Sequence, residues 1–295
     1  MAAHARPARV ALVAHPTRPI EAALETVQRW AREEGLDTFQ VSGRESRQRH
    51  VAPPGTLGSD DLVVALGGDG TVLSALHAAA HVNAPVLGVA CGSLGALTAV
   101  AGDRVGQALE RVSAGDWTAR GLPALAVDPV DAPGDWAIND FVVVRRGSGQ
   151  VVADVWVDDE LYVRVAGDGL IVATALGSSA YSMAAGGPLL VSGTPAIVCT
   201  PLAMHGGSAP PLVVPATANL QVRVHPSFAG FNIEIDGHAA SLEALDYHLS
   251  LHEEKVTLVS FDDPGLGIAG LRKRRLIIDS PRVLARDDRA ARAHD

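Results

Sequence analysis

The pattern between residues 62 and 71 narrows the choice of fold more than any other part of the chain. Five apolar residues, 62–66, are followed directly by Gly67-Gly68-Asp69-Gly70-Thr71 and then by an alanine- and leucine-rich segment, 72–80. A short apolar run bounded by turn residues is typical of a buried parallel strand, and the segment after it has helical character. A strand that enters a helix through glycines leaves free backbone N–H groups, which can bind phosphate oxygens. The sequence therefore predicts a phosphate-binding turn.

Asp69 is an unusual residue for simple anion binding, because its carboxylate repels phosphate. Such a carboxylate is useful if it holds a metal ion, or if it accepts a proton from a hydroxyl that attacks a phosphoryl group. The simpler alternative is a plain connection between strand and helix in which Asp69 caps the helix. These residues alone leave both interpretations open.

The first hundred residues alternate between short apolar runs and amphipathic segments. Strands are expected at 10–14, 39–41, 62–66 and 85–89, and helices at 19–33, 72–80 and 105–113. This alternation is typical of a parallel sheet with helices on its faces. A second glycine turn, 92–95, follows a strand, at the sheet edge where such folds bind ligands. We therefore predict an α/β nucleotide-binding domain over residues 1–118.

The pattern changes near Gly115 to short β-rich runs separated by hairpin-type turns. This predicts an all-β, sandwich-like domain over residues 119–265. One helix-like segment, 179–185, interrupts it, a terminal helix is expected at 266–276, and residues 266–295 are expected to return to the first domain, with a frayed end. The expected strands are 124–127, 137–144, 153–157, 161–165, 170–173, 196–200, 211–214, 220–224, 233–235, 249–251 and 256–259.

Composition restricts the partners. The chain has 295 residues, 47% of them hydrophobic, and a net charge of −9 from 33 acidic and 24 basic residues. Such a charge argues against nucleic acid or an anionic membrane as the main partner, whereas anionic small molecules can still bind at local glycine turns. Two cysteines form no disulfide framework, and the sequence has neither a signal peptide nor an apolar run of membrane-spanning length. We expect a cytoplasmic protein.

Several polar motifs lie outside the first glycine turn. Each has a plain structural explanation as a bulge, a turn, a helix start or a hydrogen-bonded core residue, and the basic run 272–275 is interpreted first as a solvated helix face. The motifs are Asn139-Asp140, Gly167-Asp168-Gly169, Gly177-Ser178-Ser179-Ala180-Tyr181, Gly186-Gly187-Pro188 and Pro201 to His205.

In order and spacing, these motifs together resemble the NAD kinase (ATP-NAD kinase) family. That family joins a Gly-Gly-Asp-Gly-Thr turn to a later Asn-Glu, a long segment ending in Gly-Ser-Thr-Ala-Tyr-Ser, two glycines and Pro-x-x-x-His. The matching positions here are 67–71, 139–140, 168–182, 186–187 and 201–205. The long segment is highly specific, whereas diacylglycerol and sphingoid-base kinases share the glycine turn. The resemblance covers roughly residues 10–276 and implies an α/β domain followed by a β-rich domain.

The resemblance also implies a reaction, in which Asp69 deprotonates or contacts the adenosine-ribose 2′-hydroxyl of NAD and this hydroxyl attacks the γ-phosphate of ATP. Mg²⁺, held mainly by the ATP phosphates, would neutralise the developing charge, and the protein would form a homo-oligomer, either a dimer or a tetramer. The phosphate-binding residues would be Gly67, Gly68, Gly70 and Thr71. The acceptor-binding residues would be Asn139, Asp140, Asp168, Leu176, Ser179, Ala180 and Tyr181.

The chain departs from the family pattern mainly on the acceptor side. Asp140 replaces Glu, Ala175-Leu176 replaces Pro-Thr, and Ala96 replaces a Phe. The leading hypothesis is an ATP-dependent NAD kinase that makes NADP, and the alternative is a kinase of the same fold that phosphorylates another nucleotide, a nucleoside or a sugar-like metabolite. The third hypothesis is a non-catalytic dinucleotide-binding protein, and the retained Asp69 argues against it. The sequence leaves open whether the acceptor is NAD⁺ or NADH and whether the phosphoryl donor is ATP or polyphosphate.

Overall fold

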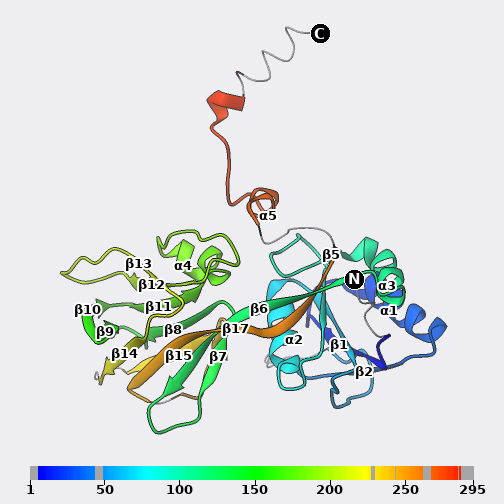
Figure 1. The fold of residues 1–295 in the computed structure, drawn as a ribbon, viewed down its shortest axis with the longest axis horizontal. Coiled ribbons are helices and arrows are strands. Elements are labelled where there is room, and N and C mark those ends of the chain that lie inside the picture. The colour runs from blue at the N-terminus through cyan, green and yellow to red at the C-terminus, as the bar shows by residue number, and fades with distance from the viewer. Residues whose placement is uncertain are drawn as a thin grey trace.

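The chain folds into two domains that lie side by side and are joined by two long strands, β6 and β17 (Figure 1). The strands of the described residues form an 11-stranded sheet and a 6-stranded sheet. No helix in the described ranges is long and apolar enough to cross a membrane. The computed structural model describes residues 6–43, 49–226, 230–242, 244–261, 267–284 and 286.

The N-terminal domain has the predicted α/β architecture. Its four main strands pair in parallel in the order β2-β1-β3-β4. Helices α1 and α3 cover one face of this sheet, and α2 covers the other, because their apolar stripes belong to two separate hydrophobic clusters. The elements are β1 (Arg9–Ala14), α1 (Glu21–Glu33), β2 (Asp37–Gln40), β3 (Leu62–Gly67), α2 (Asp69–Ala79), β4 (Val86–Ala90), β5 (Val100–Ala101), η1 (Gly102–Arg104) and α3 (Val105–Ser113).

The C-terminal domain is β-rich, as predicted, and its strands pair in antiparallel fashion. Its core lies between the two sheets and includes Phe141, Val172, Val222 and Tyr247. The elements are β6 (Thr118–Pro129), β7 (Asp135–Ala137), β8 (Asp140–Arg145), β9 (Val151–Val157), β10 (Glu160–Gly167), β11 (Gly169–Thr174), η2 (Gly177–Ser179), α4 (Tyr181–Ala184), β12 (Ala196–Leu202), β13 (Leu212–Pro215), β14 (Leu220–His225), β15 (Phe231–Ile235), β16 (His238–Ala239) and β17 (Asp246–Ser260).

Three of the predicted strands were wrong in detail. Residues 249–251 and 256–259 belong to the single 15-residue strand β17, which pairs with β6 along most of its length and reaches β4, where Leu258 pairs with Val86. Residues 137–144 fall in two strands, because β7 ends at Ala137 and β8 begins only at Asp140. Strand β17 therefore carries the sheet of one domain into the other.

The C-terminal segment follows β17 with the short helix α5 (Ile268–Lys273). The predicted helix 266–276 is therefore shorter, and its first residue lies outside the described residues. Of the frayed end predicted beyond Ser280, the structure describes only residues 281–284 and 286. In Figure 1, α5 lies above the region where the two domains meet.

Candidate active site

The predicted glycine turn lies at the carboxyl edge of the parallel sheet, between β3 and α2. Gly68 precedes the helix with an extended backbone, and Asp69 is the first helical residue. The start of α2 thus presents the free backbone N–H groups expected of a phosphate-binding turn. Gly70 is exposed at this edge. Thr71 is buried, and its hydroxyl has no hydrogen-bond partner among the residues that the structure describes.

The Asp69 side chain does not cap its own helix. Instead, the backbone N–H of Ala96 donates to Oδ2 at 2.7 Å, and that of Leu97 donates to Oδ1 at 2.9 Å. The second predicted glycine turn therefore fixes the carboxylate of the first. Since a carboxylate oxygen has two lone pairs, each oxygen keeps one for a substrate hydroxyl. This arrangement can orient a hydroxyl and accept its proton.

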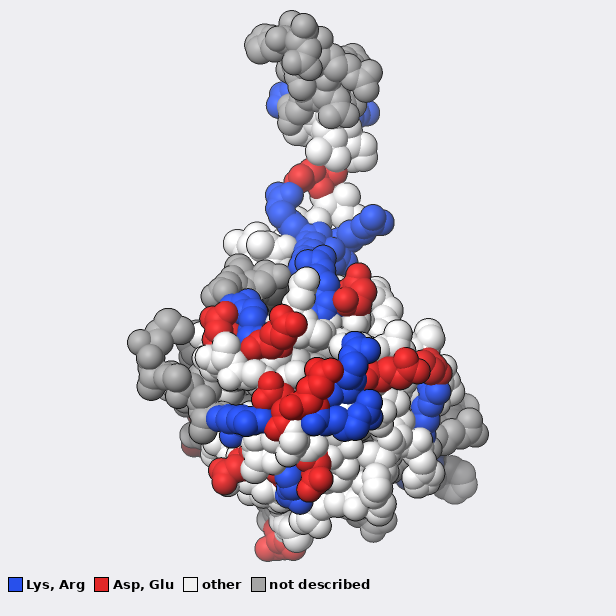
Figure 2. All heavy atoms as spheres, turned by 90° about the vertical axis from the view of Figure 1, so that its right-hand side faces the viewer, with Lys and Arg blue, Asp and Glu red and all other residues white. Residues whose placement is uncertain are grey.

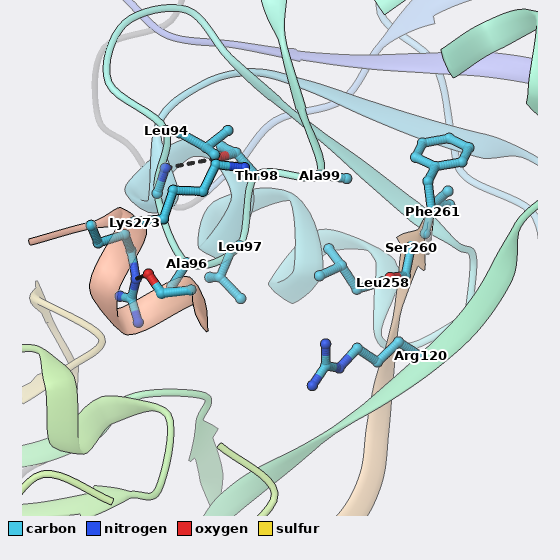
Figure 3. A pocket seen from close by; sticks show the side chains of 14 residues that line it. Leu94, Ala96, Leu97, Thr98, Ala99, Arg120, Leu258, Ser260, Phe261 and Lys273 are labelled. Atoms are coloured by element: carbon cyan, nitrogen blue, oxygen red, sulfur yellow. Dashed lines mark hydrogen bonds between the residues drawn. The ribbon is translucent and has the colours of Figure 1, made fainter. Parts of the chain in front are cut away.

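The loop that holds Asp69 packs closely against the rest of the N-terminal domain. Figure 3 shows Leu94, Ala96 and Thr98 near α5, which carries Lys273, and Leu258 of β17 on the right of them. The N–H of Gly95 donates to Thr98 Oγ1 at 2.8 Å, which closes the turn. The cavity behind the loop measures about 40 Å³, whereas ligand pockets span roughly 300–1,000 Å³. We conclude that this cavity is a packing gap and that the ligand side of the loop is the side that faces Asp69.

One residue of the basic run 272–275 is turned toward this site, which the sequence did not predict. Arg272 is exposed and pairs with Asp279 at 2.8 Å, as a solvated helix face would. Arg274, however, is partly buried, and its Nη1 lies 3.5 Å from Ser179 Oγ. Burial lowers the pKa of Arg274, while the nearby charge of Asp69 raises it. Arg274 thus contacts the predicted acceptor residue Ser179 and is near enough to Asp69 to be influenced by its charge.

The Asn139-Asp140 motif is positioned by a buried carboxylate from a distant turn. Asp236 Oδ1 accepts the backbone N–H groups of Asn139 and Asp140 at 2.7 and 3.2 Å, and Oδ2 accepts that of Ile138 at 2.9 Å. The side-chain amide of Asn139 has no hydrogen-bond partner among the described residues. Its donors and acceptor are therefore available to a ligand.

Burial, followed by the charges of Asp236 and Glu234, raises the pKa of the Asp140 carboxyl to about 7. In the unfolded chain this carboxyl titrates near pH ~3.9. Between these values the folded chain binds a proton that the unfolded chain has lost, so the free energy of unfolding falls as the pH rises. We expect Asp140→Asn to remove this contribution, about 1.4 kcal/mol per pKa unit at most. Thermal unfolding from about pH 4 to 8 tests this, and a variant that follows the wild-type curve would contradict it.

Helix α2 reaches the same segment through His77. The Nε2 atom of His77 lies 2.7 Å from Asp236 Oδ2, both side chains are buried, and the imidazole stacks on Trp136 at 4.0 Å. The helix that begins with Asp69 is thereby tied to the turn that holds Asn139. Sequence analysis missed both His77 and Asp236.

We expect His77→Ala to lower the free energy of unfolding by about 1–3 kcal/mol, because it removes a partner of a buried carboxylate. His81 offers a matched control, since it is exposed just beyond the same helix, and His81→Ala should change stability by less than about 0.5 kcal/mol. Denaturant unfolding of both variants provides the measurement. Equal effects of the two substitutions would show that the His77 contact does not stabilise the chain.

Asp168 and Tyr181 lie together in a cavity of about 520 Å³ on the C-terminal domain, which is in the range of ligand pockets. Arg145 Nε donates to Asp168 Oδ1 at 2.6 Å, so the Asp168 carboxylate that lines this cavity forms an ion pair with Arg145. Tyr181 is exposed, as is Ala180 before it. The remaining residues that line the cavity are Val144, Ala184, Ala185, Leu202 and Ala203.

Leu176 is placed differently from the other predicted acceptor residues. Its side chain is 6% exposed and belongs to the hydrophobic cluster around α2, together with Val72 and Ile138. Its predicted contact with the acceptor therefore stays a prediction. Ser179, three residues later, is only partly buried, and its hydroxyl donates to the carbonyl of Leu176 at 3.0 Å.

No group of three or more His, Cys, Asp or Glu side chains with the geometry of a metal site occurs in the described part of the chain. Asp69 supplies a single carboxylate at the glycine turn, and Mg²⁺ binds readily through one or two carboxylates together with substrate phosphates. The residues present therefore fit an ion that arrives with a phosphorylated ligand.

Two family models match the chain, the ATP-NAD kinase N-terminal domain over residues 10–117 and the ATP-NAD kinase C-terminal domain over residues 138–251. The NAD kinase of Koribacter versatilis is 33% identical over 242 residues, which cover 77% of this chain and 84% of that protein. The NAD kinase of Heliobacterium modesticaldum is 37% identical over 182 residues, which cover 60% of this chain and 64% of that protein, just under two thirds of its length.

Solved structures of the same fold include two kinases. A yeast NADH kinase in complex with NADH superposes with a TM-score of 0.77 at 20% identity, covering 94% of this chain and 89% of that one. An Archaeoglobus fulgidus NAD kinase in complex with ATP superposes with a TM-score of 0.68 at 19% identity, covering 92% of this chain and all of the other. At this identity, both structures support the fold.

Proposed function

The chain belongs to the ATP-NAD kinase family, and we propose that it transfers the γ-phosphate of ATP to the adenosine-ribose 2′-hydroxyl of NAD, giving NADP. The observation that carries this proposal is the Asp69 carboxylate, which is fixed at a phosphate-binding turn by two backbone N–H groups from a second turn. A binding protein for nucleotides has no use for an anion at that place, whereas phosphoryl transfer needs a group that orients the attacking hydroxyl.

In this proposal Asp69 accepts the proton of the ribose 2′-hydroxyl as its oxygen bonds to the γ-phosphorus and ADP leaves. The backbone at Gly67, Gly68, Gly70 and Thr71 binds the phosphates of ATP, and Mg²⁺ enters as the MgATP complex, where it neutralises phosphate charge. Because catalysis of this kind is mostly positioning, the fixed orientation of Asp69 matters as much as its charge.

The C-terminal domain supplies the acceptor site in this proposal. The unpartnered amide of Asn139 hydrogen-bonds the adenine, and Asp140 lies near a ribose. The cavity of Asp168 and Tyr181 takes the nicotinamide end, and Ser179 and Ala180 line the adenine side. The tie between His77 and Asp236 supports this division, because it joins the helix of Asp69 to the segment of Asn139.

One observation favours a second candidate, a kinase of this fold that acts on a different hydroxyl. Leu176 stands where the family has a threonine, and its side chain is buried in an apolar cluster. A missing polar contact to a ligand costs about 1–3 kcal/mol, or roughly ten- to hundredfold in affinity. Release of ADP from MgATP should be measured with NAD⁺, NADH, other nucleotides, nucleosides and sugars as separate acceptors. Turnover with NAD⁺ or NADH supports the first candidate, and turnover with another acceptor alone supports the second.

The proposed enzyme works in the cytoplasm on small-molecule nucleotides and forms a homo-oligomer. Cys91 and Cys199 are free thiols, which suits a reducing compartment. Over the main body of the face shown in Figure 2, below the basic side chains at its top, acidic and basic side chains are interspersed, which is unlike a nucleic-acid-binding surface. Leu161 of β10 and Val213 of β13 are exposed apolar residues on strands at the ends of the two sheets, which supports a self-association surface on the β-rich domain.

A further inference from the structure

Arg18 lies in the loop between β1 and α1, beside both glycine turns. A Cβ atom placed on Gly68 would lie 3.2 Å from Arg18 Nη1, and one placed on Gly92 would lie 2.8 Å from the same atom. The guanidinium therefore rests against the backbone of the two turns that follow β3 and β4. Side chains at either glycine would crowd the arginine at this position.

The backbone of this loop is fixed, which holds the base of the Arg18 side chain in place. The N–H groups of Thr17 and Arg18 donate to His15 Nδ1 at 3.2 and 3.1 Å, and Arg49 Nη1 donates to the carbonyl of Arg18 at 3.2 Å. Arg49 also pairs with Glu21 at 2.5 Å, so that acid is already occupied.

The Arg18 guanidinium itself has no hydrogen bond or ion pair with any residue that the structure describes. It carries five N–H donors and a permanent charge. A charged fork with no protein partner, held over a phosphate-binding turn, is complementary to the oxygens of a phosphate group, which arginine binds in a bidentate manner. The charge also acts locally, since it partly opposes the burial that raises the pKa of the Cys91 thiol.

We propose that Arg18 binds the phosphates of the nucleotide donor together with the glycine turn. This inference rests on the proposed kinase function. It adds the positive charge of the Arg18 guanidinium to the phosphate-binding turn 67–71, which has no basic residue of its own. The triphosphate must approach the Asp69 carboxylate on a chain whose net charge is −9. A positive group beside Gly68 offsets the repulsion between the phosphates and these negative charges, which otherwise only the backbone N–H groups of the turn would oppose. Arg274 contacts Ser179, whereas the guanidinium of Arg18 is the one that a Cβ atom at Gly68 would meet.

The test is the affinity of the purified full chain for ADP, inorganic tripolyphosphate, adenosine and NAD⁺, measured separately by calorimetry. We expect Arg18→Ala to weaken the binding of ADP and of tripolyphosphate by about 10- to 100-fold, as for the loss of a charged hydrogen-bonding partner. Arg18→Lys should recover part of the loss, because the charge stays while the fork is lost. Adenosine and NAD⁺ should bind as to the wild type.

Arg29→Ala is the matched control, because Arg29 is an exposed arginine on α1, and it should leave all four affinities unchanged. Thermal unfolding shows whether each variant is folded. Unchanged ADP binding by Arg18→Ala and Arg18→Lys would overturn the role of Arg18 alone, as would an equal loss for adenosine. A loss for NAD⁺ instead of ADP would assign the guanidinium to the acceptor. A wild-type chain that binds neither ADP nor tripolyphosphate would overturn the proposed function, and this role with it.

Discussion

Replacing Asp69 with Asn is expected to lower kcat by about 10²–10⁴-fold, since the variant loses the group that we propose accepts the proton of the attacking hydroxyl. The fold should survive. The Asn oxygen can still accept one of the two backbone N–H groups that now bind the carboxylate, and the loss of the other costs about 1 kcal/mol. Steady-state kinetics of NADP formation, together with the Tm, separate the two effects.

The matched control for this experiment is Asp103→Asn, because Asp103 is an exposed acid on η1. Its kcat should stay within about twofold of the wild type, as for other surface substitutions. ADP binding by Asp69→Asn should be retained or strengthened, since a negative charge near the phosphates has been removed. Full activity of Asp69→Asn would eliminate this residue as the base, and a collapse of Tm would show that its role is structural.

Replacing Gly95 with Ala is expected to affect kcat nearly as strongly, although Gly95 takes no part in the chemistry. A Cβ there would lie under 3.0 Å from both carboxylate oxygens and from the Cγ of Asp69. Either the carboxylate or the loop that donates to it must shift, and a shift of about 1 Å can cost about 10²-fold in rate. The measurement is kcat for the single variants and for the double variant with Asp69→Asn.

The double variant shows whether Gly95 acts through Asp69. If it does, adding Gly95→Ala to Asp69→Asn should lower kcat little further, because both changes remove the same interaction. Gly106→Ala is the control, since Gly106 lies in α3 and its Cβ would make only an ordinary contact with Thr26 of α1. This variant should be neutral or stabilising by up to about 1 kcal/mol. Wild-type kcat in Gly95→Ala, or multiplicative losses in the double variant, would contradict this account.

Much of the fold could be predicted from local pattern. Buried parallel strands such as β3 are continuous apolar runs, and amphipathic helices such as α1 have one apolar stripe, so both can be read from sequence. Strand β17 could not be predicted as one element. Its middle residues between His252 and Val256 are polar, and its pairing with β6 has an irregularity there. Apolar periodicity breaks at that point, while the backbone continues because it pairs across both domains.

The predicted site residues came from motifs, whereas the residues that were missed depend on tertiary contacts. His77 and Asp236 are 159 residues apart, and neither stands out on its own, because a histidine in a helix and an aspartate in a turn are common. Arg18 had no signal beyond its place just after the first strand, on the edge where the glycine turns lie. Arg274 is brought to Ser179 only because the C-terminal segment returns over the site.

The most direct test of the proposed reaction compares NAD⁺ with its analogue that lacks the adenosine-ribose 2′-hydroxyl, under MgATP, with ADP release and NADP formation followed together. The proposal predicts equal amounts of ADP and NADP from NAD⁺, and no ADP above the acceptor-free background from the 2′-deoxy analogue. ADP release at the same rate with both compounds would contradict it, because the transferred phosphate would then be going to another hydroxyl or to water.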